Sequence, residues 1–586
     1  MNNTRFHLSS LQFPKPGEGQ RFLLLSILIG IFSGLLVVCF HIAIDSITWY
    51  GLENPNGRSR IFLVALPAVA ALVAVVLIRF WFPGAKGSGV VDTKAAIYIS
   101  DGHVPFSAVF GKFLACAISI GGGNSLGPED PSLHMGAGVA SQLGRVFHLS
   151  RDKMRLIAPV GAAAGLAAAF NTPISAVLFV IEEIVADWSG GVLGSIVLAA
   201  VSAAVVVRWF LGGHPLFTVP DFELTHPSEL LVYALIGVAG GFLSVAFIRA
   251  IEKMRRALAR LPKQSELFLP PLAGLIVGLC GIWLPQVMGA GYGAIDSALH
   301  DRFAWKILLL LAGVKMLVTL LCFSAKTPGG MFAPTLFAGA MIGGGIGGFA
   351  QLHWPFPTSQ TGAYVLVGMG TFFAGVFRAP MTSIFMTFEV SASYVIILPV
   401  MISNTIAYLI SRQLQKTPFF TMIAAEEGQY LPSLEEQREA TDLRVENAMT
   451  APPKSIFAAT TPVAQVLAAA RRSGFAIVTR REGEWSIVSA KELESALEAG
   501  LGDRPLSQVV SLEPLPRLYR DLTLDAALKL LGSHPFLPVS SRRRPFRLIG
   551  TVALDDIHRT YGVRPPEPAA GKQEEALPDT TLSTAD

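Results

Sequence analysis

Residues 121–136 read GGGNSLGPEDPSLHMG, and this stretch decides how the rest of the chain is interpreted. Its glycines and Pro128 interrupt a helix, whereas Pro131 and the small residues after it suit the first turn of a new one. Two adjacent acids, Glu129 and Asp130, lie here in the most apolar half of the chain, where a charge is costly and usually functional. The stretch therefore predicts a helix N-terminus whose free N–H groups and positive dipole end face a negative group.

Composition indicates a membrane protein. Of the 586 residues, 52% are hydrophobic and only 15% are charged, whereas soluble domains carry about 25% charged residues. The net charge of +4 is too small on this length to indicate a nucleic-acid partner. The cysteines have no disulfide or metal-ligand spacing, so we expect them to pack in apolar segments and we expect no metal site; they are Cys39, Cys116, Cys280 and Cys322.

Apolar segments long enough to cross a bilayer, or nearly so, recur along the first 423 residues. They are residues 22–44, 61–78, 106–120, 156–181, 188–207, 230–248, 267–284, 307–323 and 390–411, and residues 327–377 contain no charged side chain. We therefore expect an all-α polytopic membrane domain over residues 21–423. The polar segment 1–20 before it does not have the pattern of a signal peptide.

An ordered series of motifs occurs twice in this domain. Residues 112–144 align with 315–347 at an offset of 203, and GSG at 87–89 and FNTPIS at 170–175 match GAG at 289–291 and FRAPMT at 377–382. Interrupted helices in matching halves are typical of inverted-repeat transporters, so we predict two halves, 22–210 and 228–423. The alternative is a general similarity between membrane helices rich in Gly, Ala and Pro.

The composition changes after the membrane domain. Residues 424–444 are charged and are predicted to be a linker, whereas 445–562 have the composition of a soluble α/β domain. Two units in it each read helix, apolar strand, strand, helix. The tail, 563–586, is rich in Pro, Glu and Thr and is predicted to be disordered.

Four ordered motifs resemble the signature segments of the CLC chloride channel/transporter family; they are Gly87–Val91, Gly127–Pro131, Ile181–Glu183 and Gly330–Pro334. The two C-terminal units resemble tandem CBS domains. The resemblance implies an inverted-repeat membrane domain of about eighteen helices, a homodimer with one anion path in each subunit, and no enzyme activity. Two functions are open within this family: chloride/proton exchange and a passive chloride channel.

The resemblance also implies where the anion binds. Partial charges at helix N-termini hold an anion that must also leave, whereas a buried Lys or Arg would hold it too tightly. In the family, a serine at position 88 favours chloride, and Phe420 takes the position of a tyrosine whose hydroxyl usually faces the anion. The implied chloride-binding residues are Gly87, Ser88, Gly89, Met331, Phe332 and Phe420.

Acidic residues carry the implied proton chemistry. Glu129 matches the family's gating glutamate, which occupies the anion's position when ionised and swings away when protonated. Glu183, with Glu182 beside it, matches the acid that delivers protons in the family's exchangers, and passive channels usually have an apolar residue there. The alternative is that this pair only marks a helix end. Glu389, at the matching position of the second half, is expected to be structural.

Three residues depart from the family pattern. Pro128 replaces a basic residue before the gating glutamate, Asp130 replaces the glycine after it, and Val91 replaces a proline at the end of the first motif. Asp130 adds a negative charge beside an anion path, so two roles stay open for it: it caps a helix, or it repels anions.

The CBS-like pair suggests a regulatory ligand and an orientation. CBS domains bind adenine nucleotides, and the candidate residues here are Ser489, Glu492 and Asp556; the alternative is a purely structural role in dimerisation. A nucleotide-binding domain would lie in the cytosol, which puts both termini on the cytoplasmic side of the cell (inner) membrane. The basic cluster between Arg145 and Arg155 fits a cytoplasmic loop. A cation transporter would need more clustered acids than the sequence offers.

Overall fold

The computed structural model describes residues 18–53, 60–185, 190–213, 216–220, 224–429, 431, 443–452, 455–481, 484–532, 534–542 and 544–560. The chain divides into two compact units, 1–431 and 432–586, which are described separately. The predicted tail lies outside the described residues, as do most of the N-terminal segment 1–20 and part of the linker 424–444.

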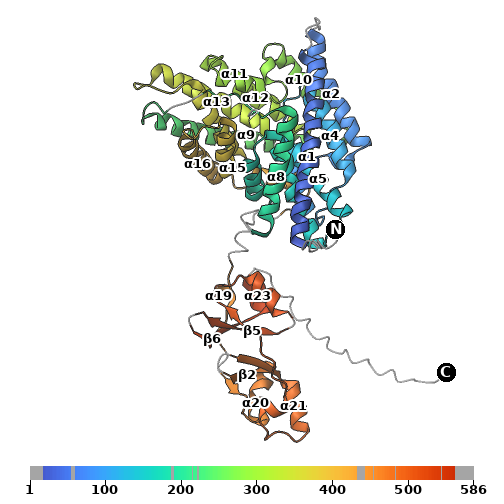
Figure 1. Cartoon of the computed structure of the whole chain (residues 1–586), viewed down its shortest axis with the longest axis vertical. Coiled ribbons are helices and arrows are strands. Elements are labelled where there is room, and N and C mark those ends of the chain that lie inside the picture. The colour runs from blue at the N-terminus through green and yellow to red at the C-terminus, as the bar shows by residue number, and fades with distance from the viewer. Residues whose placement is uncertain are drawn as a thin grey trace, which may run out of the picture. The chain divides into compact units, whose positions relative to one another are not determined.

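The first unit is built of helices, and among the described residues strands occur only in the second unit (Figure 1). The α-helices of the first unit are α1 (Glu18–Thr48), α2 (Arg60–Phe80), α3 (Gly89–Tyr98), α4 (Phe106–Gly121), α5 (Glu129–Val146), α6 (Arg151–Phe170), α7 (Pro173–Phe179), α8 (Gly190–Leu211), α9 (Glu229–Ala259), α10 (Leu269–Gly281), α11 (Tyr292–Leu299), α12 (Trp305–Ser324), α13 (Phe332–His353), α14 (Thr361–Phe377), α15 (Pro380–Ser391), α16 (Ile397–Leu414) and α17 (Phe419–Glu426). Short 3-10 or π turns are η1 (Trp49–Glu53), η2 (Pro83–Ala85), η3 (Val180–Val185), η4 (Lys263–Leu267) and η5 (Pro285–Val287).

Within the described residues, eight helical segments are long and apolar enough to cross a bilayer, and α4 and α14 are shorter apolar helices. The long segments contain α1, α2, α6, α8, α9, α10, α12 and α13. The predicted all-α, multi-pass membrane domain is therefore confirmed.

Two of the predicted apolar segments, of which 390–411 was expected to be a single span, each divide between two helices. Residues 156–181 divide between α6 and α7, because Asn171 turns the backbone to a positive φ of 55° and Pro173 begins a new helix. Residues 390–411 divide between α15 and α16, where Ala392 has a positive φ of 51°. Apolar composition alone predicts a continuous helix at both places, whereas the local backbone ends it.

Helices of the two halves pack in matching pairs. α1 packs against α8 and α5 against α6, while α9 packs against α16 and α13 against α14. The α5–α6 contact is close because Gly136 faces Gly161 and Gly165, where a Cβ would overlap the backbone of the facing helix. Gly339 and Gly368 form the equivalent contact between α13 and α14. Small residues allow this approach in lipid, where association depends on packing rather than on apolar burial.

The second unit contains two three-stranded sheets of the same topology, in which the first strand pairs in parallel with the second and the third pairs antiparallel to the second. The predicted order helix, strand, strand, helix is confirmed in both, but the pattern does not predict the short first strand. The elements are α19 (Val445–Ala448), β1 (Ile456–Ala458), α20 (Val463–Ser473), β2 (Phe475–Arg481), β3 (Glu484–Ser489), α21 (Ala490–Glu498), α22 (Leu506–Val509), β4 (Leu518–Tyr519), α23 (Leu524–Leu531), β5 (Phe536–Ser541), β6 (Arg544–Ala553) and α24 (Leu554–Thr560).

The glycine contact between α5 and α6 can be tested by a substitution that adds a single methyl group. Gly136→Ala places that group on the backbone of α6, and we expect the overpacking to destabilise the protein by about 1–3 kcal/mol. Gly313→Ala in α12 is the matched control, because nothing lies within 4 Å of a Cβ built at Gly313. Thermal unfolding of the detergent-solubilised protein, followed by tryptophan fluorescence, should show a lower Tm for the first variant alone. Equal Tm values would contradict the close packing.

Candidate functional site

Two backbone hydrogen bonds join the N-termini of α5 and α13. The N–H of Gly127 donates to the carbonyl of Gly330 at 2.8 Å, and the N–H of Gly330 donates to the carbonyl of Gly127 at 2.7 Å. These glycines are 203 positions apart, which is the offset of the sequence repeat. The pair brings the two interrupted stretches face to face, so the first turns of both helices begin close together.

Glu129 is the first residue of α5 and is completely buried. Its Oε2 accepts a hydrogen bond from the backbone N–H of Ala333 at 3.3 Å, and Tyr292, at the start of α11, donates its hydroxyl to Oε1. Met331 and Phe332 are the N-cap and the first residue of α13, so the structure brings these two candidates together with Glu129. The carboxylate lies at the positive end of the α13 dipole, a position that suits an anion.

Asp130 caps the N-terminus of α3. Ser88 donates its hydroxyl to Oδ1 at 3.1 Å, and the N–H groups of Gly89 and Val90 donate to the carboxylate at 2.9 and 2.8 Å. Of the two roles that the sequence leaves open for Asp130, this geometry is that of a helix cap. Gly87 precedes the cap with a positive φ of 97°, a conformation that favours glycine. The donors of Ser88 and Gly89, which the resemblance assigns to chloride, are bonded to a side chain of the protein.

Two buried lysines support the glycine turns at these helix starts. Lys112 in α4 donates to the carbonyl of Gly87 at 3.1 Å and to Asp92 at 2.7 Å. Lys315 in α12 donates to two backbone carbonyls, including that of Gly289 at 2.7 Å. Both ammonium groups are therefore directed at the turns, and neutral donors hold the carboxylates of Glu129 and Asp130.

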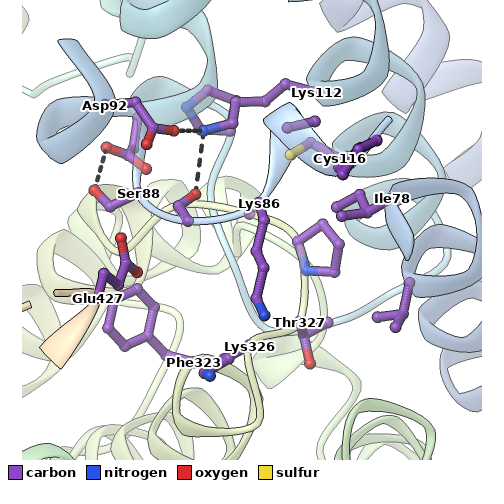
Figure 2. A pocket seen from close by; sticks show the side chains of 18 of the residues that line it. Ile78, Lys86, Ser88, Asp92, Lys112, Cys116, Phe323, Lys326, Thr327 and Glu427 are labelled. Atoms are coloured by element: carbon purple, nitrogen blue, oxygen red, sulfur yellow. Dashed lines mark hydrogen bonds and ion pairs between the residues drawn. The ribbon is translucent and has the colours of Figure 1, made fainter. Parts of the chain in front are cut away.

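A cavity of about 560 Å³ reaches Ser88 and Asp130. Figure 2 shows the side chain of Lys86 pointing through this space toward Lys326. Both lysines pair with Glu266, at 3.2 and 3.0 Å. The cavity thus brings both cationic and acidic side chains, among them Glu427, near the capped start of α3 (Figure 2).

Phe420, in the first turn of α17, packs in an aromatic cluster. Its ring stacks on Phe377 with centroids 5.3 Å apart and lies 6.2 Å from the ring of Phe332. Phe179 in α7 contacts both Phe332 and Phe420, at 5.1 and 6.3 Å. Phe420 therefore borders the start of α13, where it presents an apolar ring.

A family model described as voltage gated chloride channel matches residues 69–412. The chain belongs to this family. It is 31% identical to a putative chloride channel protein ClcB-like of Ralstonia nicotianae, over 65% of this chain and 91% of the relative. It is 30% identical to the H(+)/Cl(-) exchange transporter ClcA of Cronobacter sakazakii, over 69% of this chain and 89% of the relative. A crystal structure of a eukaryotic CLC transporter shares the fold, with a TM-score of 0.61 and 20% identity over 92% of this chain and 98% of that one.

The adjacent acids Glu182 and Glu183 of this chloride channel family member have different partners. Glu183 is buried on the π turn η3 and forms an ion pair with the equally buried Lys94 of α3. Glu182 accepts hydrogen bonds from the N–H groups of Met381 and Thr382, at 3.1 and 2.9 Å, at the start of α15. The two carboxylates, both expected in the proton path, therefore contact different helices.

Glu389 makes the reciprocal contact from the second half. It lies in α15, 207 positions after Glu182, and accepts hydrogen bonds from the N–H groups of Ile174 and Ser175 at 2.9 and 2.8 Å. These two residues begin α7. Each half of the membrane unit thus supplies the acid that caps a short helix of the other half.

Three residues that the structure brings into the site were not among the predicted site residues: Tyr292, Ala333 and Lys94. Tyr292 directly follows residues 289–291, which align with the motif at 87–89. The sequence repeat could therefore have indicated Tyr292 as a site residue. Ala333 contributes its backbone N–H, which no side-chain pattern reveals. Lys94 is a charge within the membrane domain, and such a costly charge signals a buried partner.

The candidate nucleotide-binding residues lie at helix starts in the second unit. Ser489 and Glu492 form a capping box at α21, in which the serine hydroxyl accepts from the N–H of Glu492 and the glutamate accepts from the N–H of Ser489. Asp556 accepts from the N–H of Ala553 at 3.0 Å, which caps α24. All three side chains are engaged with their own helices.

The reciprocal caps of α7 and α15 predict equal sensitivity to mutation. Glu182→Ala and Glu389→Ala each leave two N–H groups without their acceptor, and we expect each to destabilise the protein by about 1–3 kcal/mol. The matched Gln variants keep an acceptor oxygen, so their loss should be smaller. Thermal unfolding of the purified full-length protein measures the effect. A Glu182→Ala protein as stable as the unmodified chain, beside an unstable Glu389→Ala protein, would show that the two caps are not equivalent.

Proposed function

We propose that this protein exchanges chloride for protons across a membrane and that Glu129 is the group that both ions use. The observation that carries the proposal is the Glu129 carboxylate, which is completely buried and bonded to the N–H of Ala333 at the start of α13. An ionised carboxylate there has the charge of a chloride ion and competes with it. The relative from Cronobacter sakazakii, named as an H(+)/Cl(-) exchange transporter, supports the same assignment.

The proposed anion path uses neutral donors. Backbone N–H groups at the start of α13, from Met331 and Phe332, form its outer binding position, and the start of α3 forms the inner one. These dipoles attract an anion without the strong hold of a buried ammonium group, so that it can move on. The implied chloride-binding set stays as predicted: Gly87, Ser88, Gly89, Met331, Phe332 and Phe420.

We assign proton delivery to Glu183 rather than to Glu182. The Glu182 carboxylate accepts hydrogen bonds from two N–H groups of α15 and so caps the start of that helix. Glu183 is buried beside Lys94, and Phe179, one helical turn before it, contacts Phe332 next to the Glu129 site. A proton moving from Glu183 to Glu129 passes this apolar cluster, so water has to enter there to carry it.

A passive chloride channel gated by Glu129 is the alternative, and the relative from Ralstonia nicotianae is named as a putative chloride channel protein. Current through reconstituted protein separates the two functions. The reversal potential of an exchanger shifts when a pH gradient is imposed at constant chloride, whereas that of a channel does not. A reversal potential that ignores the gradient would replace the exchange proposal with the channel.

Glu129→Gln tests the coupling directly. The amide has nearly the shape of the carboxylate but neither binds a proton nor competes as an anion, so we expect chloride-driven proton uptake to fall at least tenfold, about 1.4 kcal/mol or more in coupling. Chloride flux should continue and should lose its pH dependence. Proteoliposomes loaded with chloride, with both ions followed together, measure this. Glu389→Gln is the control, because Glu389 caps the start of α7 outside the site, and this variant should retain coupling. Unchanged coupling in Glu129→Gln would refute the role.

The ion pair of Glu183 with Lys94 complicates the test of proton delivery. Glu183→Gln leaves Lys94 buried without its carboxylate, and breaking such a pair costs about 3–5 kcal/mol. The double variant Lys94→Met/Glu183→Gln removes both charges and should recover most of the lost Tm. Proton flux should stay low in both variants while chloride flux continues. Normal proton flux in the stable double variant would exclude Glu183 from the proton path.

The assembly and its orientation are further parts of the proposal. We propose an inverted-repeat homodimer in the inner membrane, with both termini cytoplasmic and one complete site in each subunit. The matching helix pairs and the reciprocal caps of Glu182 and Glu389 support the repeat. Ser88, Glu129 and Phe332 all come from one chain, so the site does not require a partner subunit. Crosslinking in native membranes and cysteine labelling from either side test the dimer and the orientation.

We propose that the two sheets of the second unit are tandem CBS domains. Their shared strand, helix, strand, strand, helix order supports this. An adenine nucleotide would bind near Ser489, Glu492 and Asp556. These side chains would have to bind it while they keep the hydrogen bonds that cap α21 and α24. A shift in Tm when ATP is added to the full-length protein would support nucleotide binding, and no shift at millimolar ATP would leave the pair a structural module.

A further inference from the structure

Asp130 occupies the donors that an anion would need at the start of α3. Its carboxylate is buried and accepts one hydrogen bond from the Ser88 hydroxyl and one each from the N–H groups of Gly89 and Val90. Three converging neutral donors form the kind of site that binds a small monovalent anion at a helix N-terminus. While the Asp130 carboxylate accepts these three hydrogen bonds, the donors are not available to a free anion.

Two neighbouring acids bond to the N-termini of two different helices. Glu129 and Asp130 are consecutive residues in the first turn of α5, yet Glu129 bonds to the start of α13 and Asp130 bonds to the start of α3. α3 belongs to the first half of the membrane unit and α13 to the second. One short segment therefore presents a tethered negative charge to each half.

The Asp130 position can be reached from the cavity. Asp130 and Ser88 both line the space of about 560 Å³, into which Lys86 extends (Figure 2). The nearby Lys112 directs its ammonium group at Asp92 and at a carbonyl, and the donors recorded for Asp130 are all neutral. An anion arriving through the cavity thus meets a carboxylate held by the same kind of bond that the anion itself would form.

We propose that Asp130 is a second tethered anion, which competes with the transported anion for the start of α3 and must leave it before an anion from the cavity can bind there. The inference rests on the proposed function, because it assumes that an anion passes this point. It adds to the gating glutamate a residue that lowers the affinity of the inner position for chloride.

Asp130→Gly tests the competition. Removing the side chain frees the Ser88 hydroxyl and the two N–H groups, so we expect purified full-length protein to bind chloride at least tenfold more tightly in calorimetric titration with KCl. Asp130→Asn is the matched control for charge, because its amide oxygen can still accept from the Ser88 hydroxyl and the N–H of Val90, although it loses the acceptor for Gly89. Its gain in chloride affinity should be smaller than that of Asp130→Gly.

A double-mutant cycle with Ser88→Ala separates direct competition from a general effect of charge. In the unmodified chain, Ser88→Ala removes a hydrogen-bond donor both from the Asp130 carboxylate and from chloride, so the two losses partly cancel in the competition. In the Asp130→Gly protein, Ser88→Ala removes the donor from chloride alone. We therefore expect Ser88→Ala to lower chloride affinity by a factor at least threefold larger in the Asp130→Gly protein than in the unmodified chain. An equal effect of Ser88→Ala in both backgrounds would overturn direct competition.

Chloride affinity that is unchanged in a folded Asp130→Gly protein would show that Asp130 is only a helix cap. If that variant fails to fold, Asp130→Asn decides, and unchanged affinity there also overturns the proposal. Binding is measured without a proton gradient, so this result is independent of whether Glu129 couples protons. Loss of coupling without a gain in chloride affinity would refute the present inference and leave the proposed exchange intact.

Discussion

The pair of backbone hydrogen bonds between Gly127 and Gly330 is the constraint on which the site depends. Two interrupted helices can present their N-termini to one location only if the turns before them approach to bonding distance. Glycine permits this approach, because a Cβ at Gly127 would overlap Ala333 and the Glu129 carboxylate. Once the turns are joined, α5 and α13 begin together, and Glu129 on one helix reaches the first free N–H groups of the other.

Around this constraint, the membrane unit uses charge in two ways. Its lysines support the turns: Lys112 and Lys315, equivalent in the repeat, both donate to backbone carbonyls of the glycine segments. The acids Glu129 and Asp130 face helix N-termini instead. The lysine amines therefore lie behind the turns, and the partial charges of backbone N–H groups face the two carboxylates.

Much of the fold could be predicted from the sequence, because apolar composition and helix-breaking residues are local signals. Apolar composition was misleading at 156–181 and 390–411, where one residue with positive φ, Asn171 or Ala392, ends a helix inside an apolar run. The helix starts of the site were also predicted. The side-chain contacts were not, because the partner of Asp130 is 42 positions away at Ser88 and the partner of Glu129 is 163 positions away at Tyr292. Such pairings follow from tertiary packing, and no local pattern encodes them.

The reciprocal caps of α7 and α15 have a consequence for the order in which the protein is made. When the ribosome has synthesised the first half, the N–H groups of Ile174 and Ser175 exist, but Glu389, which will accept from them, does not. The N–H groups at the start of α7 therefore have no Glu389 acceptor until roughly two hundred further residues have been synthesised. The caps of α7 and α15 join residues of the two halves, so both caps can form only after the second half has been synthesised.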